Sequence, residues 1–319
     1  MSRIAGLEAK PGSRTSSSIR TGTRPASYVE LPFTLIRGKR DGPTFCLTAG
    51  VHGTEYAGIE AAIRLSRRVE PDRLKGTLII VPVVNVPAFE ARTYICPLDG
   101  VNIQGSFPGK PDGTIAQLIA HKVYSEFVSK SNYYLDLHGG AAHESEIAFS
   151  GFFETGDPKI DEVSEQMARA LSFEYVWRTN KDGYMGKGST WRTAPENGVP
   201  SALAEYGSGD KLLEEEVAGM YDGVINVMRQ VRMLDGEPKI LKEQKILTQF
   251  VPVTARYGGM FHLHVKPGDS VTQGHELGEL TDLRGEVLET VKAPVKGVVL
   301  VTIHNPVVDP GQKVVYLGR

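Results

Sequence analysis

Apolar, β-branched runs alternate with helical patterns over most of this chain, and this alternation limits its fold more than any other feature. A helical pattern begins near Ala57, and Asp157 with Pro158 marks the start of another helix. The expected strands are 28–36, 45–49, 77–84, 133–137, 147–153 and 201–206, and the later helices are 114–128, 157–171 and 212–233. The pattern predicts an α/β domain whose largely parallel or mixed sheet is covered by helices on both faces.

The sequence pattern changes after about residue 245, where short β-rich segments alternate with turns such as Lys266-Pro267-Gly268-Asp269. No helical period occurs there, and the turn spacing predicts a small all-β barrel or sandwich of about 70 residues. At the other end, residues 1–27 are rich in Ser, Thr, Gly and Arg. We expect an N-terminal arm (1–27) that is poorly ordered or ordered only by a partner chain, an α/β domain (28–243) and a β domain (244–319).

Composition excludes several classes of protein. The 319 residues are 23% charged and 40% apolar, with a formal net charge of −2, so no nucleic-acid partner is expected. No apolar stretch reaches membrane-spanning length, and the N-terminus lacks a signal-peptide core. Two cysteines make a disulfide framework unexpected, which favours a cytoplasmic protein. A homo-oligomer is expected if the arm packs against a second copy.

Residues 52–55, His-Gly-Thr-Glu, stand between an apolar strand and an amphipathic helix. Gly50 ends the strand, so His52 and Glu55 lie three residues apart on a tight strand-to-helix turn. One imidazole nitrogen and one carboxylate from such a turn can bind a single divalent metal ion, with zinc as the first choice. The alternative is a surface histidine beside a glutamate that the helix dipole favours. The small residues on either side favour the metal ligands.

A third ligand is expected at His138, which ends an apolar run and is followed by two glycines. Asp136 points to the same face of this strand, where it could orient the imidazole or lie close to the metal. A histidine at a strand end can instead be capped by backbone groups. The ligand role is the favoured one.

Glu205 is the expected general base. It lies at the end of an otherwise apolar strand, where a carboxylate is costly unless it is paired or functional. It could take a proton from water and deliver it to a leaving amine; a salt bridge to an arginine is the alternative. His52, His138 and Glu205 each follow or end a predicted strand, and ligands of α/β sheets collect at the carboxyl ends of strands. We therefore expect these residues to converge.

Residues 92–109 form a long Pro/Gly-containing loop whose apolar and aromatic content favours function over disorder. Arg92 could polarise a scissile carbonyl and stabilise the oxyanion, or it could be a surface cation at the end of a helix. Asn102 and Gln104 are candidates for substrate contacts. Asp99 and Asn102 could equally form turns.

Four motifs follow one another in a familiar order: residues 49–55, the 92–109 loop with Asp-Gly-Val-Asn and Phe-Pro-Gly, Asp136-Leu137-His138, and Glu205-Tyr206-Gly207. Together they resemble the succinylglutamate desuccinylase/aspartoacylase family, a branch of the zinc carboxypeptidase-like hydrolases. The resemblance spans nearly the whole chain after the arm. It implies a zinc carboxypeptidase-like mixed sheet flanked by helices, followed by a small C-terminal all-β domain.

The resemblance also implies roles. His52, Glu55 and His138 would bind one zinc ion per chain, Glu205 would be the catalytic acid and base, and Arg92 would polarise the carbonyl. Residues 28–243 would form the zinc hydrolase catalytic domain. The implied reaction is hydrolysis of an N-acyl amide, a carbon–nitrogen bond other than a peptide bond, by water whose pKa zinc lowers toward roughly 7.

One pair of residues departs from the family pattern. Gln104-Gly105 stands where the family has Asn-Arg, a pair expected to hold a substrate carboxylate. Either the substrate lacks a carboxylate there, or Arg178 or Arg192 takes the role. We expect a zinc-dependent deacylase for a small N-acylated amine or amino-acid derivative distinct from the usual aspartoacylase and desuccinylase substrates. The alternatives are a carboxypeptidase-like peptidase, an esterase, or a non-catalytic zinc-binding homologue.

Overall fold

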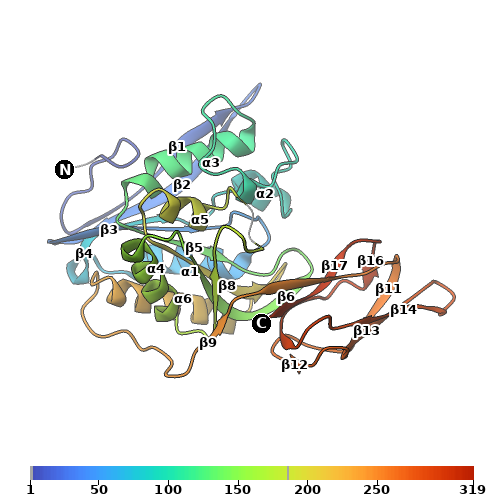
Figure 1. Cartoon of the computed structure of the whole chain (residues 1–319). Helices are drawn as coiled ribbons and strands as arrows, with labels where there is room; N and C mark the ends of the chain where they lie inside the picture. The colour runs from blue at the N-terminus through green and yellow to red at the C-terminus, as the bar shows by residue number, and fades with distance from the viewer. Residues whose placement is uncertain (1–2, 185–186) are drawn as a thin grey trace.

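A 13-stranded sheet runs through the computed structural model, which describes residues 3–184 and 187–319. Figure 1 shows this sheet continuing from the helix-covered part of the molecule toward the C-terminal strands. The strands before residue 210 are β1 (Ser13–Thr23), β2 (Tyr28–Arg37), β3 (Arg40–Ala49), β4 (Lys75–Val81), β5 (Tyr133–His138), β6 (Glu144–Phe153), β7 (Tyr175–Thr179) and β8 (Ser201–Ser208).

The order and direction of these strands place the site. The sheet runs β1-β2-β4-β3-β5-β8-β6, and the four central strands β4, β3, β5 and β8 are parallel to one another. β6 is antiparallel to β8, and β2 is antiparallel to β4. The mixed sheet predicted from the sequence is therefore confirmed, and the carboxyl ends of β3, β5 and β8 lie at the same edge.

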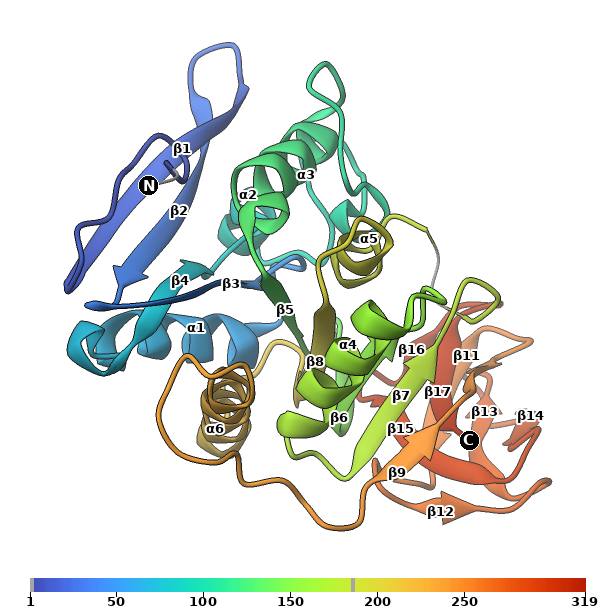
Figure 2. The same ribbon diagram turned by 60° about the vertical axis from the view of Figure 1, so that its left-hand side comes forward.

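Helices cover both faces of the sheet (Figure 2). One hydrophobic cluster joins the sheet to α1, α4 and α6, and another joins it to α3 and α5. The predicted N-cap is confirmed, because the Asp157 side chain accepts a hydrogen bond from Lys159 N–H at the start of α4. The helices are α1 (Tyr56–Arg68), α2 (Val86–Ala91), α3 (Ile115–Glu126), α4 (Pro158–Ala170), α5 (Thr190–Glu196) and α6 (Glu214–Gln230), with short 3₁₀ turns at Pro71–Arg73, Ile103–Gly105 and Val128–Lys130.

The C-terminal segment is all β, as its turn spacing predicts. Its strands are β9 (Lys245–Leu247), β10 (Phe250–Thr254), β11 (Gly259–Leu263), β12 (Ser270–Val271), β13 (Glu276–Thr281), β14 (Val287–Lys292), β15 (Gly297–Ile303), β16 (Val307–Val308) and β17 (Lys313–Gly318). β14, β13, β11 and β16 form a separate four-stranded antiparallel sheet. β15 and β17 instead extend the main sheet, because β15 pairs with β6. The domain boundary at 243/244 stays a prediction.

The N-terminal arm departs from expectation. Residues 13–23 form β1, which pairs antiparallel with β2 of the same chain over almost its whole length. Thr21 is buried, and a Cβ on Gly22 would lie 3.2 Å from the side chain of Ile115 on α3. The arm is therefore ordered by its own chain. Pairing with β2 satisfies the backbone hydrogen bonds of this segment, while its polar side chains can remain exposed. Residues 1 and 2 lie outside the described residues.

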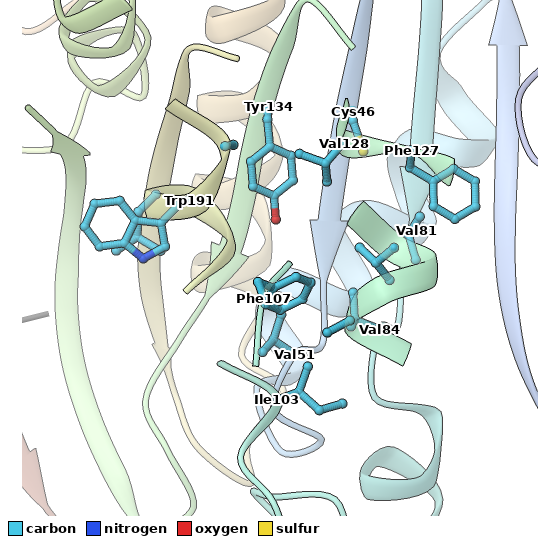
Figure 3. Packing of buried hydrophobic residues seen from close by; sticks show 14 of the residues in the cluster. Cys46, Val51, Val81, Val84, Ile103, Phe107, Phe127, Val128, Tyr134 and Trp191 are labelled. Atoms are coloured by element: carbon cyan, nitrogen blue, oxygen red, sulfur yellow. The ribbon is translucent and has the colours of Figure 1, made fainter. Parts of the chain in front are cut away.

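Strand alternation assigns each side chain of β5 to a face. Tyr134 packs in the cluster with α3 and α5, whereas Leu135 and Leu137 pack in the cluster with α1 and α6. Asp136 and His138 share the face of Tyr134, because side chains two apart point the same way. Figure 3 shows Tyr134 within this cluster, together with Ile103 and Phe107 from the loop that follows α2.

None of the helices in the described ranges combines the length and the apolar character that a membrane crossing requires.

Candidate active site

The strand-to-helix turn at residues 50–55 is built by backbone contacts. Gly50 adopts a positive φ of 64°, which ends β3 and turns the chain toward α1. Asn85 supports the turn, since its backbone N–H donates to Gly50 O over 2.8 Å and its side chain donates to Val51 O over 3.2 Å. His52 and Glu55 are both 4% exposed. The turn therefore presents an imidazole and a carboxylate in a buried setting.

The three predicted metal ligands lie close together in the structure. One ligand atom from each of His52, Glu55 and His138 lies within 4.8 Å of the other two. Glu55 stands between the imidazoles: Oε1 is 2.6 Å from His52 Nδ1, and Oε2 is 3.0 Å from His138 Nδ1. β5 brings His138 beside the turn because β5 is the parallel neighbour of β3. The cluster could hold a metal ion.

The far nitrogen of each imidazole has a partner of its own. His52 Nε2 is 3.2 Å from Asn102 Oδ1, and His138 Nε2 is 3.2 Å from Asp136 Oδ2. Oxygen acceptors there favour a proton on Nε2 and leave Nδ1 of both rings for a metal ion. Asp136 is itself fixed by Thr48, whose hydroxyl donates to Oδ1 over 2.6 Å. The orienting role predicted for Asp136 agrees with this geometry.

The ionisable groups of the cluster shift one another's pKa. Burial raises the pKa of Glu55, but the neighbouring His52 and His138 outweigh it and hold that pKa below its usual value. Burial lowers the pKa of His138, whereas the Asp136 and Glu55 carboxylates raise it well above its ordinary value. Without a metal, the cluster therefore favours a protonated imidazole between carboxylates; a metal ion would displace that proton.

A cavity of about 320 Å³ opens beside the cluster, a size at the lower end of small-molecule sites. Its walls come from both parts of the chain, with Phe250, Val301 and Tyr316 contributed by the C-terminal strands. The other lining residues are His52, Glu55, Tyr94, Asn102, Gln104, His138, Gly139, Ala141, Glu144, Glu146, Phe149, Trp177, Tyr184 and Glu205.

A larger cavity of about 990 Å³ lies elsewhere, lined by residues such as Arg40 at the start of β3 and Glu174 just before β7. It is therefore at the amino ends of these strands and holds none of the predicted ligands. Ligand sites in α/β sheets lie at the carboxyl ends, so the smaller cavity is the candidate active site.

Glu205 lies where the sequence predicts it. It ends the buried part of β8 opposite His138 in the strand register, and it is half-buried at the cavity wall. Burial raises its pKa well above the usual value, the nearby His138 opposes the shift, and the Glu55 carboxylate adds to it. No ion pair to an arginine is found for Glu205 among the described residues, so the predicted structural alternative lacks support.

Arg92 is not brought into the site. It caps α2 in a left-handed conformation with φ 57° and is exposed, outside the cavity wall. The loop that follows does reach the site, because Tyr94 stacks on His52 with ring centroids 3.8 Å apart. The carbonyl-polarising role of Arg92 stays a prediction.

Of the two loop residues that depart from the family pattern, Gln104 lines the cavity, whereas Gly105 is exposed and is not one of its wall residues. Asn102 contacts His52 and also accepts a hydrogen bond from Gln104 N–H over 2.8 Å, so it is both a turn former and a wall residue. Gln104 Oε1 is buried and finds no hydrogen-bond partner within residues 3–184 and 187–319. A Cβ on Gly105 would meet no atom within 4 Å. The place of the expected arginine is open space.

The two candidate replacement arginines lie elsewhere. Arg178 is half exposed and stands 3.5 Å from Glu154. Arg192 is buried on α5, 3.1 Å from Glu196 and over the Phe153 ring at 4.7 Å. Neither belongs to the cavity wall as far as the described residues define it. Their substrate-binding role stays a prediction without support from this arrangement.

Sequence reasoning missed several wall residues. Glu144 and Glu146 alternate on β6, and Phe149, Trp177, Tyr184, Phe250 and Tyr316 add aromatic rings. The alternation of two glutamates at the start of an apolar strand was a visible signal for Glu144 and Glu146. Phe250 and Tyr316 had none, since long-range strand pairings, of β15 with β6 and of β9 with β7, bring the C-terminal strands to the site.

The comparisons with known proteins fit this architecture. Residues 41–231 match the family model of the succinylglutamate desuccinylase/aspartoacylase catalytic domain. An N-alpha-acetyl-L-2,4-diaminobutyric acid deacetylase from Halomonas elongata is 31% identical over 260 residues, which cover 80% of this chain and 75% of the relative. The chain therefore belongs to the succinylglutamate desuccinylase/aspartoacylase family, as its motifs predicted.

Solved structures agree over the whole chain. A product-bound structure of the ectoine utilization protein EutE (DoeB) from Ruegeria pomeroyi has a TM-score of 0.88 at 26% identity, covering 97% of this chain and 96% of that one. A succinylglutamate desuccinylase/aspartoacylase from Rhodobacter sphaeroides has a TM-score of 0.87 at 25% identity, covering 100% and 99%. The likeness includes the C-terminal β region.

Proposed function

We propose that this chain is a zinc-dependent deacylase that hydrolyses the amide bond of a small N-acylated amino-acid derivative. One observation carries the proposal: His52, Glu55 and His138 form a buried cluster on the wall of the cavity that Glu205 also lines. The relative from Halomonas elongata, named as a deacetylase of an Nα-acetylated diamino acid, supports an N-acetyl amide as the bond cleaved.

The donor set fits zinc. Two imidazoles and one carboxylate are ligands that zinc accepts in hydrolases, with a coordination position left for water or substrate. Glu55 Oε2 is buried and faces His138 Nδ1 at 3.0 Å, a position in which a shared cation could replace the proton between the two groups. His52, Glu55 and His138 would hold the ion. When bound, zinc supplies a Lewis acid for the amide carbonyl and acidifies water.

The protein's own groups would perform the proton transfers. Glu205 would take a proton from the attacking water and deliver it to the leaving nitrogen, which otherwise departs as a poor leaving group. Asn102 and Asp136 would hold the ligand imidazoles in the orientation that leaves Nδ1 available. Tyr94 would exclude water from one side of His52, because the two rings stack.

The substrate would differ from those of the usual aspartoacylases and desuccinylases. Gly105 leaves open space where the family pattern has an arginine. None of the residues recorded on the cavity wall is a lysine or arginine. A side-chain carboxylate of the substrate would therefore lack the bidentate partner that such groups require.

Turnover of matched substrates tests the proposal. Wild-type protein loaded with zinc is assayed on N-acetyl and N-succinyl amino acids, a dipeptide and an amino-acid ester. We expect hydrolysis of an N-acetyl amino acid. In Glu205→Gln we expect kcat to fall on the order of 10²–10⁴-fold with zinc content unchanged.

Stoichiometric zinc without turnover of any of these substrates would favour a non-catalytic homologue instead. Faster cleavage of the dipeptide or the ester would favour the peptidase or esterase alternative. Full activity in Glu205→Gln would remove the assigned general base. The cytoplasmic location and a homo-oligomeric state remain predictions of the sequence.

A further inference from the structure

Four carboxylates line the cavity, and the proposed chemistry uses only two of them. Glu55 belongs to the metal cluster, and Glu205 is the proposed base. Glu144 and Glu146 have no part in either task. Both lie on β6 and point to the same face, because they are two residues apart on a strand.

Glu146 is the more unusual of the pair. Its side chain lines the cavity, the residue is 8% exposed, and Oε1 is buried with no hydrogen-bond partner among the residues that the structure describes. A buried carboxylate without a partner is costly, and it is normally retained where it meets a cation. Glu144 is half-buried beside it. It accepts a hydrogen bond from Ala141 N–H over 3.2 Å, and a hydrogen bond with the Tyr316 side chain helps to lower its pKa.

Aromatic rings surround the same part of the cavity. Phe250 lies at their centre, with ring centroids 5.0 Å from Trp177, 5.3 Å from Tyr316 and 6.0 Å from Phe149. Tyr184 stacks on Phe250 at 5.3 Å. Ring faces attract organic cations, and they do so most strongly where water is excluded. Carboxylates next to aromatic rings form a setting suited to an ammonium group.

None of the described wall residues is a lysine or arginine that could neutralise the pair. The exposed ammonium group of Lys313 donates to the Tyr184 hydroxyl over 2.7 Å and lies over the Tyr184 ring at 5.2 Å. It lowers the pKa of Glu144 without being a wall residue. Lys313 therefore occupies the rim and leaves the place beside Glu146 to a ligand.

We propose that Glu146 and Glu144 bind an ammonium group on the amine half of the substrate, with the surrounding aromatic rings completing the subsite. The enzyme then selects N-acylated diamino compounds over N-acylated acids. This inference rests on the proposed deacylase function and assigns the specificity of the same site.

Without a cation, the surroundings of the pair disfavour its charged forms. Burial raises the pKa of Glu146 well above its usual value, and the Glu205 and Glu144 carboxylates raise it further. Burial also raises the pKa of Glu144, and the Ala141 amide opposes that shift. A bound ammonium group would favour the charged forms of both side chains.

Three substrates whose side chains share two methylene groups and differ in the charge of the group that follows test the inference. They are the Nα-acetyl derivatives of L-2,4-diaminobutyrate, the amino acid for which the Halomonas elongata relative is named, of the neutral L-norvaline and of the anionic L-glutamate. For wild-type protein we expect kcat/KM to fall in that order, with the cation favoured over the neutral compound by about tenfold or more. Binding of free L-diaminobutyrate and L-norvaline, measured by calorimetry, gives the same comparison without turnover.

Glu146→Gln and Glu144→Gln should each reduce the ratio of kcat/KM for the cationic and neutral substrates by about tenfold. Two variants are used so that the inference can still be tested if one of them does not fold. Glu162→Gln is the matched control, because it removes a carboxylate from an exposed position on α4. We expect it to leave the ratio unchanged.

The outcomes separate the two proposals. Hydrolysis of the neutral or anionic compound at least as fast as the cation would overturn the subsite and leave the deacylase intact. An equal loss with all substrates in Glu146→Gln and Glu144→Gln would also overturn it. Absence of any turnover would count against the deacylase, and equal calorimetric affinities for the two free amino acids would then overturn the subsite as well.

Discussion

Gly53 lies so close to the backbone of Ala88 that a Cβ on Gly53 would be 2.3 Å from the Ala88 carbonyl carbon. Real side chains do not approach backbone atoms to this distance, and Ala88 is fixed within α2. The glycine between His52 and Glu55 is therefore a packing requirement, because it lets the metal-binding turn lie against the neighbouring helix.

We accordingly expect Gly53→Ala to displace this turn. Overpacking costs about 1–3 kcal/mol in the free energy of unfolding, and the displaced His52 and Glu55 would bind zinc less tightly. Gly105→Ala is the matched control, because its Cβ would enter open space. Denaturant unfolding and the zinc content of purified protein are the measurements. Equal stability and zinc content in both variants would contradict this account of the turn.

Asp136 offers a test of how the metal ligands are oriented. Asp136→Asn keeps the size of the side chain but removes the charge that faces His138 Nε2 at 3.2 Å. We expect the affinity for zinc to fall about 10–100-fold, measured by competition with a chromophoric chelator. Asp222→Asn, at an exposed position on α6, is the control. If both variants bind zinc equally well, Asp136 does not position the ligand.

Removal of metal should lower thermal stability. A ligand that binds only the folded state stabilises it by about 2.7 kcal/mol when present at 100 times its Kd, so a chelator should lower Tm and added zinc should restore it. His138→Ala should respond to neither treatment, because it lacks one of the three ligands. A wild-type Tm that is insensitive to chelator and zinc alike would argue against a zinc site.

Acid should weaken one surface ion pair in a defined range. Hydrogen bonds from Arg40 and then Lys75 lower the pKa of Asp235 to about 2 in the folded protein. The unfolded value is about 3.9, so this stabilisation is present above about pH 4 and is lost as the pH falls toward about 2. The effect is small and salt-sensitive, because Asp235 is exposed.

The difference in Tm between wild type and Asp235→Asn should therefore be positive near neutral pH and shrink on acidification. Asp112→Asn, at another exposed aspartate, serves as the control. A difference that grows as the pH falls would have the wrong sign for a carboxylate with a lowered pKa.

Much of the fold could be predicted from local pattern. β5 begins at Tyr133 and α4 follows its cap Asp157, as expected. Periodicity and capping depend on neighbouring residues, so a single sequence carries them. The strand β1 was missed for the opposite reason. Its Ser- and Thr-rich composition suggests disorder, and only its pairing with β2 makes it a strand.

The sequence by itself determined which residues could bind a metal, because His52, Glu55 and His138 are chemically suited and follow strands whose carboxyl ends share one edge of the sheet. Which side chains line the cavity opposite these three residues depends on the tertiary structure. Val301 pairs with Glu146, and this long-range pairing of β15 with β6 brings Phe250 and Tyr316 to the cavity. Such contacts join residues more than 100 positions apart, so they follow from the folded topology and leave no local pattern in the chain.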